Sequence, residues 1–151
     1  MGTINLLDGI YINTLKIIKN NKGDILRGLR SDEKFFNGFG EAYFSKIKFN
    51  TIKGWKLHKE MTMNLIVPYG IVKFVFFDDR KNSKTKGNFS EHILSQENYC
   101  RLTVSPNIWF AFMGLDDEDS IVLNLSNILH NENEVEGRLI EDIPYNWKIS
   151  E

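Results

Sequence analysis

The sequence predicts an all-β fold, a sandwich or barrel built as one domain. Short stretches with strand-like patterns recur at spacings of roughly ten residues, and turn-forming residues separate them. No apolar pattern with the period of a helix continues for more than three turns. A chain of 151 residues that is 42% hydrophobic has enough apolar material for one core, so we expect a single domain over residues 1–151.

Two strands are expected in the first fifty residues. The first covers residues 13–19 and ends at a turn over residues 20–24, where Asn and Gly tolerate positive φ. Glycines between residues 28 and 40 then argue against a long helix. In the second strand, residues 41–50, apolar and polar side chains alternate as a half-buried strand requires. The apolar parity holds Tyr43, Ile47 and Phe49.

The middle of the chain is expected to form two strands, residues 56–67 and 71–77. Pro68-Tyr69-Gly70 joins them and predicts a hairpin-like connection. The second strand is almost wholly apolar, so we expect both of its faces to be covered. Residues 79–88 are rich in Lys, Asn, Ser and Gly and predict an exposed loop.

The last third of the chain carries four more expected strands. They cover residues 91–94, 99–104, 108–114 and 121–125, and Ile121, Leu123 and Leu125 share one face of the last. The run Asp116–Asp119 lacks the Gly and the spaced carbonyl ligands of a calcium loop and predicts a solvated hairpin tip. Near the end of the chain, Tyr145 and Trp147 are expected to pack back on the barrel.

Composition excludes several classes of partner. Nineteen basic residues against twenty acidic ones give a net charge of -1, which argues against binding to nucleic acid or to an anionic membrane. The single cysteine, Cys100, cannot form an internal disulfide and indicates a reducing compartment. No apolar run approaches the ~18 residues of a membrane span, so we expect a cytoplasmic protein.

The chemistry open to the chain is limited by its three histidines, His58, His92 and His130. No close histidine pair and no second cysteine indicate a metal site, so we expect no metal. No Gly-rich phosphate loop and no local Ser-His-Asp or Cys-His signature is present, and no cofactor is expected.

His58 is the strongest candidate for a catalytic group. It lies in a strand that flanks the core, with Lys56 two residues away and Asn64 further along with the same parity. An imidazole that titrates near neutral pH is suited to removing a proton alpha to a carbonyl. Periodicity alone still favours a histidine with a structural role in the core or at the surface.

Eight short motifs follow one another along residues 23–107, within a similarity that covers roughly residues 20–147. They are Gly23-Asp24…Arg27-Gly28, Tyr43-Phe44-Ser45, Gly54-Trp55-Lys56-Leu57-His58, Pro68-Tyr69-Gly70, Asp78-Asp79-Arg80, Ser83-Lys84-Thr85-Lys86-Gly87, Leu94-Ser95-Gln96-Glu97-Asn98 and Ser105-Pro106-Asn107. In this order they resemble the dTDP-4-dehydrorhamnose 3,5-epimerase family. The resemblance implies a cupin-type β jelly roll, a double-stranded β-helix. It also implies a homodimer that acts without metal on nucleotide-linked 4-keto-6-deoxyhexoses.

The resemblance further implies the reaction. The histidine matched by His58 abstracts the proton alpha to the 4-keto group, and a tyrosine on the opposite face returns one. The developing enolate needs a positive or hydrogen-bonding group, for which strand parity favours Lys56 or Asn64. We therefore expect a nucleotide-sugar epimerase or isomerase of surface-polysaccharide biosynthesis.

Several family positions carry other residues here. An arginine before the histidine aligns with Trp55, a lysine on the next strand with Met63, and a second histidine with Phe110. The tyrosine position falls near Leu123, and no carboxylate that would orient His58 can be placed. We therefore expect the two-base 3,5-epimerisation to be altered or lost. A single-centre epimerisation or a keto-isomerisation needs only one base and an enolate stabiliser.

Six further residues are candidates for binding the substrate, and two other functions stay open. Asn64, introduced above, is one. Trp55, Trp109 and Phe112 suit stacking on a sugar or a base, or packing in the core. Arg80 and Arg27 suit the diphosphate, although Arg80 is as well placed to pair with Asp78 or Asp79. One rival function is a non-catalytic cupin that binds a saccharide or sugar nucleotide, and the other is a metal-dependent cupin.

Overall fold

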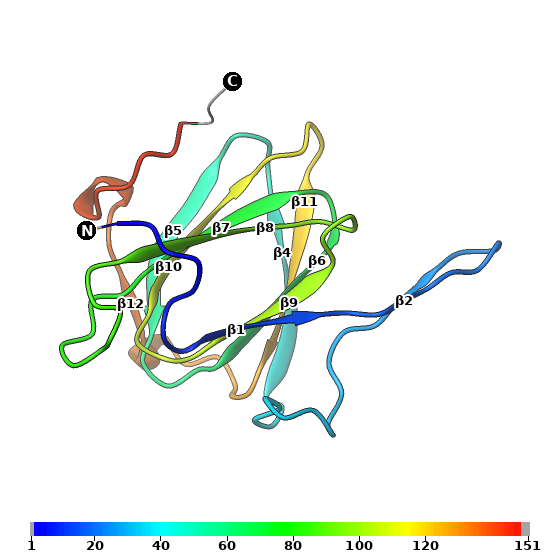
Figure 1. The fold of residues 1–151 in the computed structure, drawn as a ribbon, viewed down its shortest axis with the longest axis horizontal. Helices are drawn as coiled ribbons and strands as arrows, with labels where there is room; N and C mark the ends of the chain where they lie inside the picture. Colours follow the sequence, from blue (N-terminus) through cyan, green and yellow to red (C-terminus); the bar gives the residue numbers. More distant parts are fainter. Residues whose placement is uncertain (1, 149–151) are drawn as a thin grey trace.

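The computed structural model describes residues 2–148 and confirms the all-β prediction. Two five-stranded antiparallel sheets lie face to face and enclose the core (Figure 1). Two short 3-10 helices, η1 (Glu132–Glu134) and η2 (Ile140–Asp142), are the helical elements of this part of the chain. Within residues 2–148, no helix has the length and apolar character that a membrane span requires.

The chain passes repeatedly from one sheet to the other. The first sheet has the order β1-β9-β6-β11-β4 and the second the order β12-β5-β10-β7-β8. Strands of the first sheet are β1 (Ile10–Thr14), β4 (Glu41–Ile47), β6 (Met63–Tyr69), β9 (Cys100–Val104) and β11 (Ser120–Ser126). Strands of the second sheet are β5 (Ile52–His58), β7 (Val72–Phe77), β8 (Phe89–Leu94), β10 (Trp109–Gly114) and β12 (Val135–Gly137). This alternation is that of a jelly roll.

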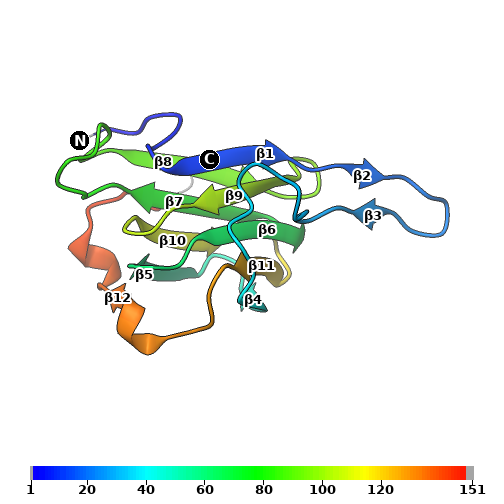
Figure 2. The same ribbon diagram turned by 90° about the horizontal axis from the view of Figure 1, so that it is seen from below.

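A two-stranded hairpin projects from the sandwich. It consists of β2 (Ile17–Ile18) and β3 (Ile25–Leu26), and it extends away from both sheets (Figures 1 and 2). The predicted turn over residues 20–24 is confirmed at its tip. The strand expected over residues 13–19 is wrong in position, because the chain pairs with β9 already over β1 and continues into the hairpin only after a break.

The prediction that the apolar strand over residues 71–77 is covered on both faces is confirmed in β7. Phe74 and Phe76 belong to the core between the sheets, whereas Val75 and Phe77 belong to a second cluster on the outer face of the second sheet. The outer cluster is covered by the end of the chain. Partly buried Ile140, Tyr145 and Trp147 pack on it, as predicted for the aromatic tail, and so does buried Ile143.

One expected strand and two expected connections are wrong. The strand expected over residues 56–67 is divided into β5 and β6, which lie in different sheets and are separated by residues 59–62. The predicted hairpin at Pro68-Tyr69-Gly70 is a crossing between sheets, because β6 pairs with β9 and β11 while β7 pairs with β8 and β10. Gly70 makes this crossing with φ of 90°, and a Cβ there would lie 2.1 Å from the Ser120 Oγ. The hairpin tip predicted at Asp116–Asp119 is wrong for the same reason, because this run joins β10 of the second sheet to β11 of the first.

Candidate active site

A pocket of about 500 Å³ opens between the two sheets at the end of the sandwich that holds β4 and β5. The second sheet contributes Lys53, Lys56, His58, Phe110 and Phe112 to its wall. The first sheet contributes Tyr43, Ser45, Met63, Leu65, Val122 and Asn124. The remaining lining residues are Glu41, Gly54, His130, Glu132 and Val135. Polar groups therefore stand on a mainly apolar floor, which is the usual composition of a small-molecule site.

His58 lies at the end of β5 and is held by a carboxylate. Its Nδ1 lies 2.8 Å from Glu134 Oε1 and 3.2 Å from Oε2. Glu134 also accepts a hydrogen bond of 3.1 Å from the Lys59 backbone N–H. Because a carboxylate only accepts, the Nδ1 of a neutral imidazole carries the proton and Nε2 keeps its lone pair for the pocket.

The His58–Glu134 pair is buried and packed against an aromatic ring. The two side chains are 8% and 2% exposed. Phe110 stacks on the His58 ring with 5.7 Å between centroids and an interplanar angle of 16°. Glu134 ends η1, and the next residue, Val135, pairs with His58 in the β12–β5 ladder. The pairing of β12 with β5 thus brings the Glu134 carboxylate to His58, a partner that could not be identified from the sequence.

A second polar pair stands on the opposite wall. Tyr43 on β4 and Asn124 on β11 are direct cross-strand partners, and Asn124 Nδ2 lies 2.9 Å from Tyr43 Oη. Burial raises the pKa of Tyr43, the hydrogen bond from Asn124 lowers it, and the carboxylates of Glu41 and Glu134 raise it further. The net pKa is raised, so the phenol keeps its proton at neutral pH.

Lys56 shares the pocket wall with His58, as strand parity predicted. Phe112 lines the same pocket from β10. The other lysine on this wall, Lys53, donates to the Lys46 backbone oxygen at 2.6 Å. An ammonium beside the imidazole can stabilise negative charge on a bound substrate, so Lys56 stays our candidate for the enolate oxygen or a phosphate.

Asn64 does not share the face of His58, and the parity argument for it is wrong. Its side chain accepts from Thr103 Oγ1 at 2.7 Å and donates to the Leu125 backbone oxygen at 3.3 Å. Its neighbours Met63 and Leu65 line the pocket instead. The alternation that starts on β5 is broken at residues 59–62, where the chain changes sheets, so parity does not carry over to β6.

Trp55 and Trp109 lie on the far face of the second sheet, in the outer cluster. Trp55 Nε1 donates to the Ile140 backbone oxygen at 3.1 Å, and the Arg138 guanidinium lies 4.4 Å from the Trp109 ring centroid. Neither tryptophan is among the residues that line the pocket. The interpretation of both as packing aromatics, left open by the sequence, fits these contacts.

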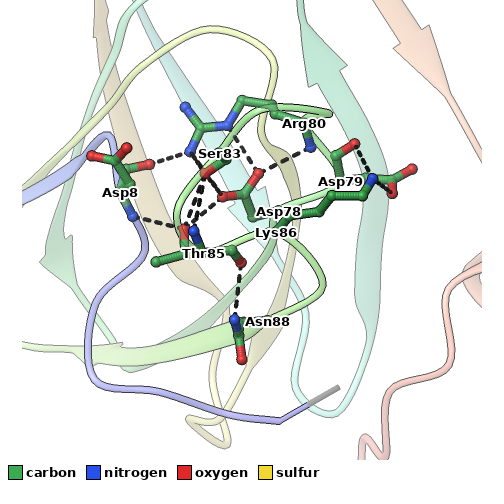
Figure 3. A network of polar contacts seen from close by, with 8 residues as sticks. All are labelled: Asp8, Asp78, Asp79, Arg80, Ser83, Thr85, Lys86 and Asn88. Carbon is green, nitrogen blue, oxygen red and sulfur yellow. Dashed lines mark hydrogen bonds and ion pairs between the residues drawn. The ribbon is translucent and has the colours of Figure 1, made fainter.

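Arg27 and Arg80 also lie away from the pocket lining. Arg27 is exposed and follows β3, at the base of the projecting hairpin. Arg80 binds the buried carboxylate of Asp78, with Nε 2.9 Å from Oδ1 and Nη2 2.9 Å from Oδ2 (Figure 3). The same guanidinium donates to the Asp8 backbone oxygen and so ties the loop to the segment before β1. The salt bridge to Asp78 is therefore the role that the structure shows for Arg80.

Asp78 makes this loop a stabilising element, and its replacement is expected to cost stability in a pH-dependent way. Its carboxylate accepts five hydrogen bonds, from Arg80, Ser83 and Thr85 (Figure 3). Burial raises the pKa of Asp78, but the hydrogen bonds from these three residues outweigh it and hold the pKa well below its ordinary value. At pH 7 we expect Asp78→Asn to lower the free energy of unfolding by roughly 3 kcal/mol.

The pH dependence follows from the sign of that shift. A carboxylate whose pKa is lowered in the folded state stabilises the fold at pH values above its unfolded pKa of about 3.9. This stabilisation is lost progressively as the pH falls below that value toward the folded-state pKa. The difference in free energy of unfolding between the wild type and Asp78→Asn should therefore decrease when urea unfolding is repeated from pH 6 down to pH 3. Asp79→Asn, at an exposed carboxylate 3.4 Å from Lys86, is the matched control and should change little. A difference in free energy of unfolding at pH 3 that equals the difference at pH 6 would contradict this role for the ionised Asp78 carboxylate.

Comparison with known proteins shows to which family the chain belongs. A solved structure of a dTDP sugar isomerase from Desulfovibrio desulfuricans G20 is 33% identical over 93% of this chain and 92% of that chain, with a TM-score of 0.90. The chain belongs to the dTDP-sugar epimerase and isomerase family. This membership confirms the resemblance drawn from the motifs, and with it the cupin-type jelly roll. No protein-family model matches the chain.

Two curated relatives are named for polysaccharide or glycan biosynthesis. The spore coat polysaccharide biosynthesis protein SpsL of Bacillus subtilis strain 168 is 23% identical over 94% of this chain and 97% of its own length. The probable low-salt glycan biosynthesis epimerase Agl13 of Haloferax volcanii is 24% identical over 90% of this chain and 86% of its own length.

Proposed function

We propose that the protein epimerises or isomerises a dTDP-linked 4-keto-6-deoxyhexose for polysaccharide biosynthesis, with His58 as the base. The observation that carries the proposal is the buried His58–Glu134 pair at the wall of the pocket. Family membership supports a dTDP-sugar substrate, because the 33%-identical relative is a dTDP sugar isomerase. The two glycan-biosynthesis relatives support the pathway.

The pair is suited to removing a proton from the carbon beside the keto group. Glu134 holds the Nδ1–H and fixes both the tautomer and the ring plane, so Nε2 can accept the proton. The resulting imidazolium lies against a carboxylate, which stabilises its charge. Phe110 covers one face of the ring and limits its contact with water.

The enolate formed in this step requires a partner for its oxygen. Lys56 lies two residues before His58 on the same wall, and it is our proposed electrostatic stabiliser. Lys56→Met is expected to slow turnover about 100-fold, with a smaller change in dTDP affinity. Steady-state kinetics and calorimetry measure the two effects separately. Equal loss in both would instead assign Lys56 to the phosphates.

The proposed function is tested by supplying dTDP-4-keto-6-deoxyglucose and identifying products by proton NMR. An epimerase or a keto-isomerase converts it to a new sugar nucleotide whose ring coupling constants report the changed centre or the moved keto group. Binding of dTDP and of the keto sugar in calorimetry without any product would favour the rival, a non-catalytic cupin that binds sugar nucleotides. Assaying the UDP- and GDP-linked analogues in parallel tests the nucleotide.

We also propose that the protein is a homodimer, because one chain leaves two apolar features on its surface. On the outer face of the first sheet, Phe44 is 68% exposed, and its cross-strand neighbour Leu123 is partly exposed with Ile121 and Leu125. The projecting β2–β3 hairpin carries Ile25, which is 57% exposed. A second copy related by a two-fold axis can cover both features at once.

Light scattering tests the dimer. The expected mass is twice the 17.6 kDa of one chain, and Phe44→Glu is expected to weaken dimerisation by at least 100-fold. Leu139→Glu places the same charge at another strongly exposed apolar residue and should leave the dimer intact. A wild-type protein that runs as a monomer at tens of micromolar would contradict the proposal.

A further inference from the structure

The strand that brings Glu134 to His58 buries little of itself. β12 has three residues and lies at the edge of the second sheet, where its neighbour is β5. Val135 is half-buried, and Glu136 and Gly137 are exposed. A short edge strand with so little buried apolar surface opens easily unless other contacts hold it. The position of Glu134 therefore depends on what fixes the chain beside β12.

Trp55 fixes the chain directly after β12. Its backbone N–H donates to the Arg138 backbone oxygen at 3.1 Å, and the Arg138 N–H donates to the Trp55 oxygen at 3.0 Å. These two bonds continue the β12–β5 ladder by one residue. The indole Nε1–H of Trp55 then donates to the Ile140 backbone oxygen at 3.1 Å. One buried residue thus binds the following segment by its backbone and by its side chain.

The segment after β12 is packed on the outer face of the second sheet. Ile143 is buried in the outer cluster, and the Trp147 ring lies 5.8 Å from the Trp55 ring, centroid to centroid. The Arg138 guanidinium lies over the Trp109 ring within the range of a cation–π interaction. Trp55 therefore connects β5 to this segment on one face of the sheet, while His58 on the same strand lines the pocket on the other face.

We propose that Trp55 is a positioning residue that keeps Glu134 against His58 from the opposite face of the sheet. This inference rests on the proposed function, because Trp55 would affect the reaction only through the His58–Glu134 pair. Residues 135–138 pair with β5 without a gap, so an anchor at residue 140 limits how far Glu134 can move. A small displacement of the carboxylate that orients a base is sufficient to slow a reaction.

Trp55→Phe tests this role, because it removes the indole N–H and keeps an aromatic ring in the outer cluster. With dTDP-4-keto-6-deoxyglucose, kcat should fall about tenfold. KM should change less than about threefold, because Trp55 does not line the pocket. Val75→Ala is the matched control, since it removes apolar atoms from the same cluster on β7, which β10 separates from β5. Its kcat should stay within about twofold of wild type.

A double-mutant cycle with Glu134→Gln shows whether Trp55 acts through Glu134. Once the carboxylate is replaced, holding this position firmly no longer helps His58, so Trp55→Phe should lower kcat by less than about a further twofold. A tenfold loss in both backgrounds would overturn the positioning role. Equal losses of kcat in Trp55→Phe and Val75→Ala would also overturn it and leave Trp55 as a packing residue.

The nitrogen-15 spectrum of His58 tests the inference independently of turnover. A looser contact with Glu134 lets the ring adopt both tautomers, so the shifts in Trp55→Phe should move from those of the Nδ1–H form toward the average of the two forms. Val75→Ala should keep the wild-type shifts. Unchanged shifts in Trp55→Phe overturn the inference. These shift changes in a protein that does not convert the keto sugar would support the placement of Glu134 by Trp55 and overturn the proposed function alone.

Discussion

Replacing His58 with alanine is expected to reduce turnover of the keto sugar by at least 1,000-fold, because no other group shown in the pocket has a buried carboxylate to orient it as a base. Binding of dTDP should change less than about threefold, since His58 acts on the sugar carbon rather than on the nucleotide. Product formation followed by NMR, together with calorimetric titration of dTDP, measures both quantities.

Two further variants make this expectation specific. His58→Asn keeps a hydrogen-bond donor near Glu134 while removing the base, so it should lose activity as His58→Ala does and be less destabilised. His92→Ala removes a histidine on β8 that bonds Ser90 and does not line the pocket. Its turnover should stay within twofold of wild type. Activity of His58→Asn within tenfold of wild type would remove His58 from the mechanism.

Replacing Glu134 with glutamine is expected to lower turnover by about 100-fold to 10,000-fold through the tautomer of His58. One carboxylate oxygen accepts the Lys59 backbone N–H, so the glutamine oxygen should occupy that position and its NH₂ group should face His58 Nδ1. Nδ1 then accepts a hydrogen bond and Nε2 carries the proton. An imidazole protonated at Nε2 cannot take the substrate proton.

Nitrogen-15 chemical shifts of the His58 ring report the tautomer directly. We expect Nδ1–H in the wild type and Nε2–H in Glu134→Gln, and Glu136→Gln, at an exposed residue of β12, should match the wild type in both spectrum and rate. A wild-type tautomer and full activity in Glu134→Gln would show that Glu134 only fills space beside His58.

The fold could be predicted wherever the order of apolar and polar residues within one strand shows which of its faces are buried. The alternation in β4 correctly puts Tyr43 and Ile47 on the inner face, and the apolar run of β7 correctly predicts burial on both sides. The crossing from β5 to β6 could not be predicted in this way, because residues 59–62 contain neither Gly nor Pro and include two buried residues, Met61 and Thr62. Nothing local marks the change of sheet there.

The site residues, too, could be predicted only where they lie on one strand. His58 and Lys56 lie on one strand, and parity is sufficient to put them on one wall, while the same parity puts Trp55 on the other face. Glu134 is 76 residues from His58 and is one of several glutamates in a polar segment. Only the pairing of β12 with β5 singles it out, and that pairing requires the three-dimensional fold.

Tyr43 shows the same difference between what one strand predicts and what the pairing of strands adds. Its inward parity was predicted, but its hydrogen bond depends on the register that sets it beside Asn124 on β11.

Deuterium incorporation tests the central claim most directly, namely that His58 removes a proton from the carbon beside the keto group. The wild-type protein is incubated in D₂O with dTDP-4-keto-6-deoxyglucose, and the sugar is analysed by proton NMR and mass spectrometry beside a His58→Ala sample. We predict deuterium at a carbon adjacent to the keto group with the wild type and none above the enzyme-free background with the variant. Saturating binding of the sugar nucleotide without deuterium uptake in the wild type, or equal uptake in the variant, would contradict the account.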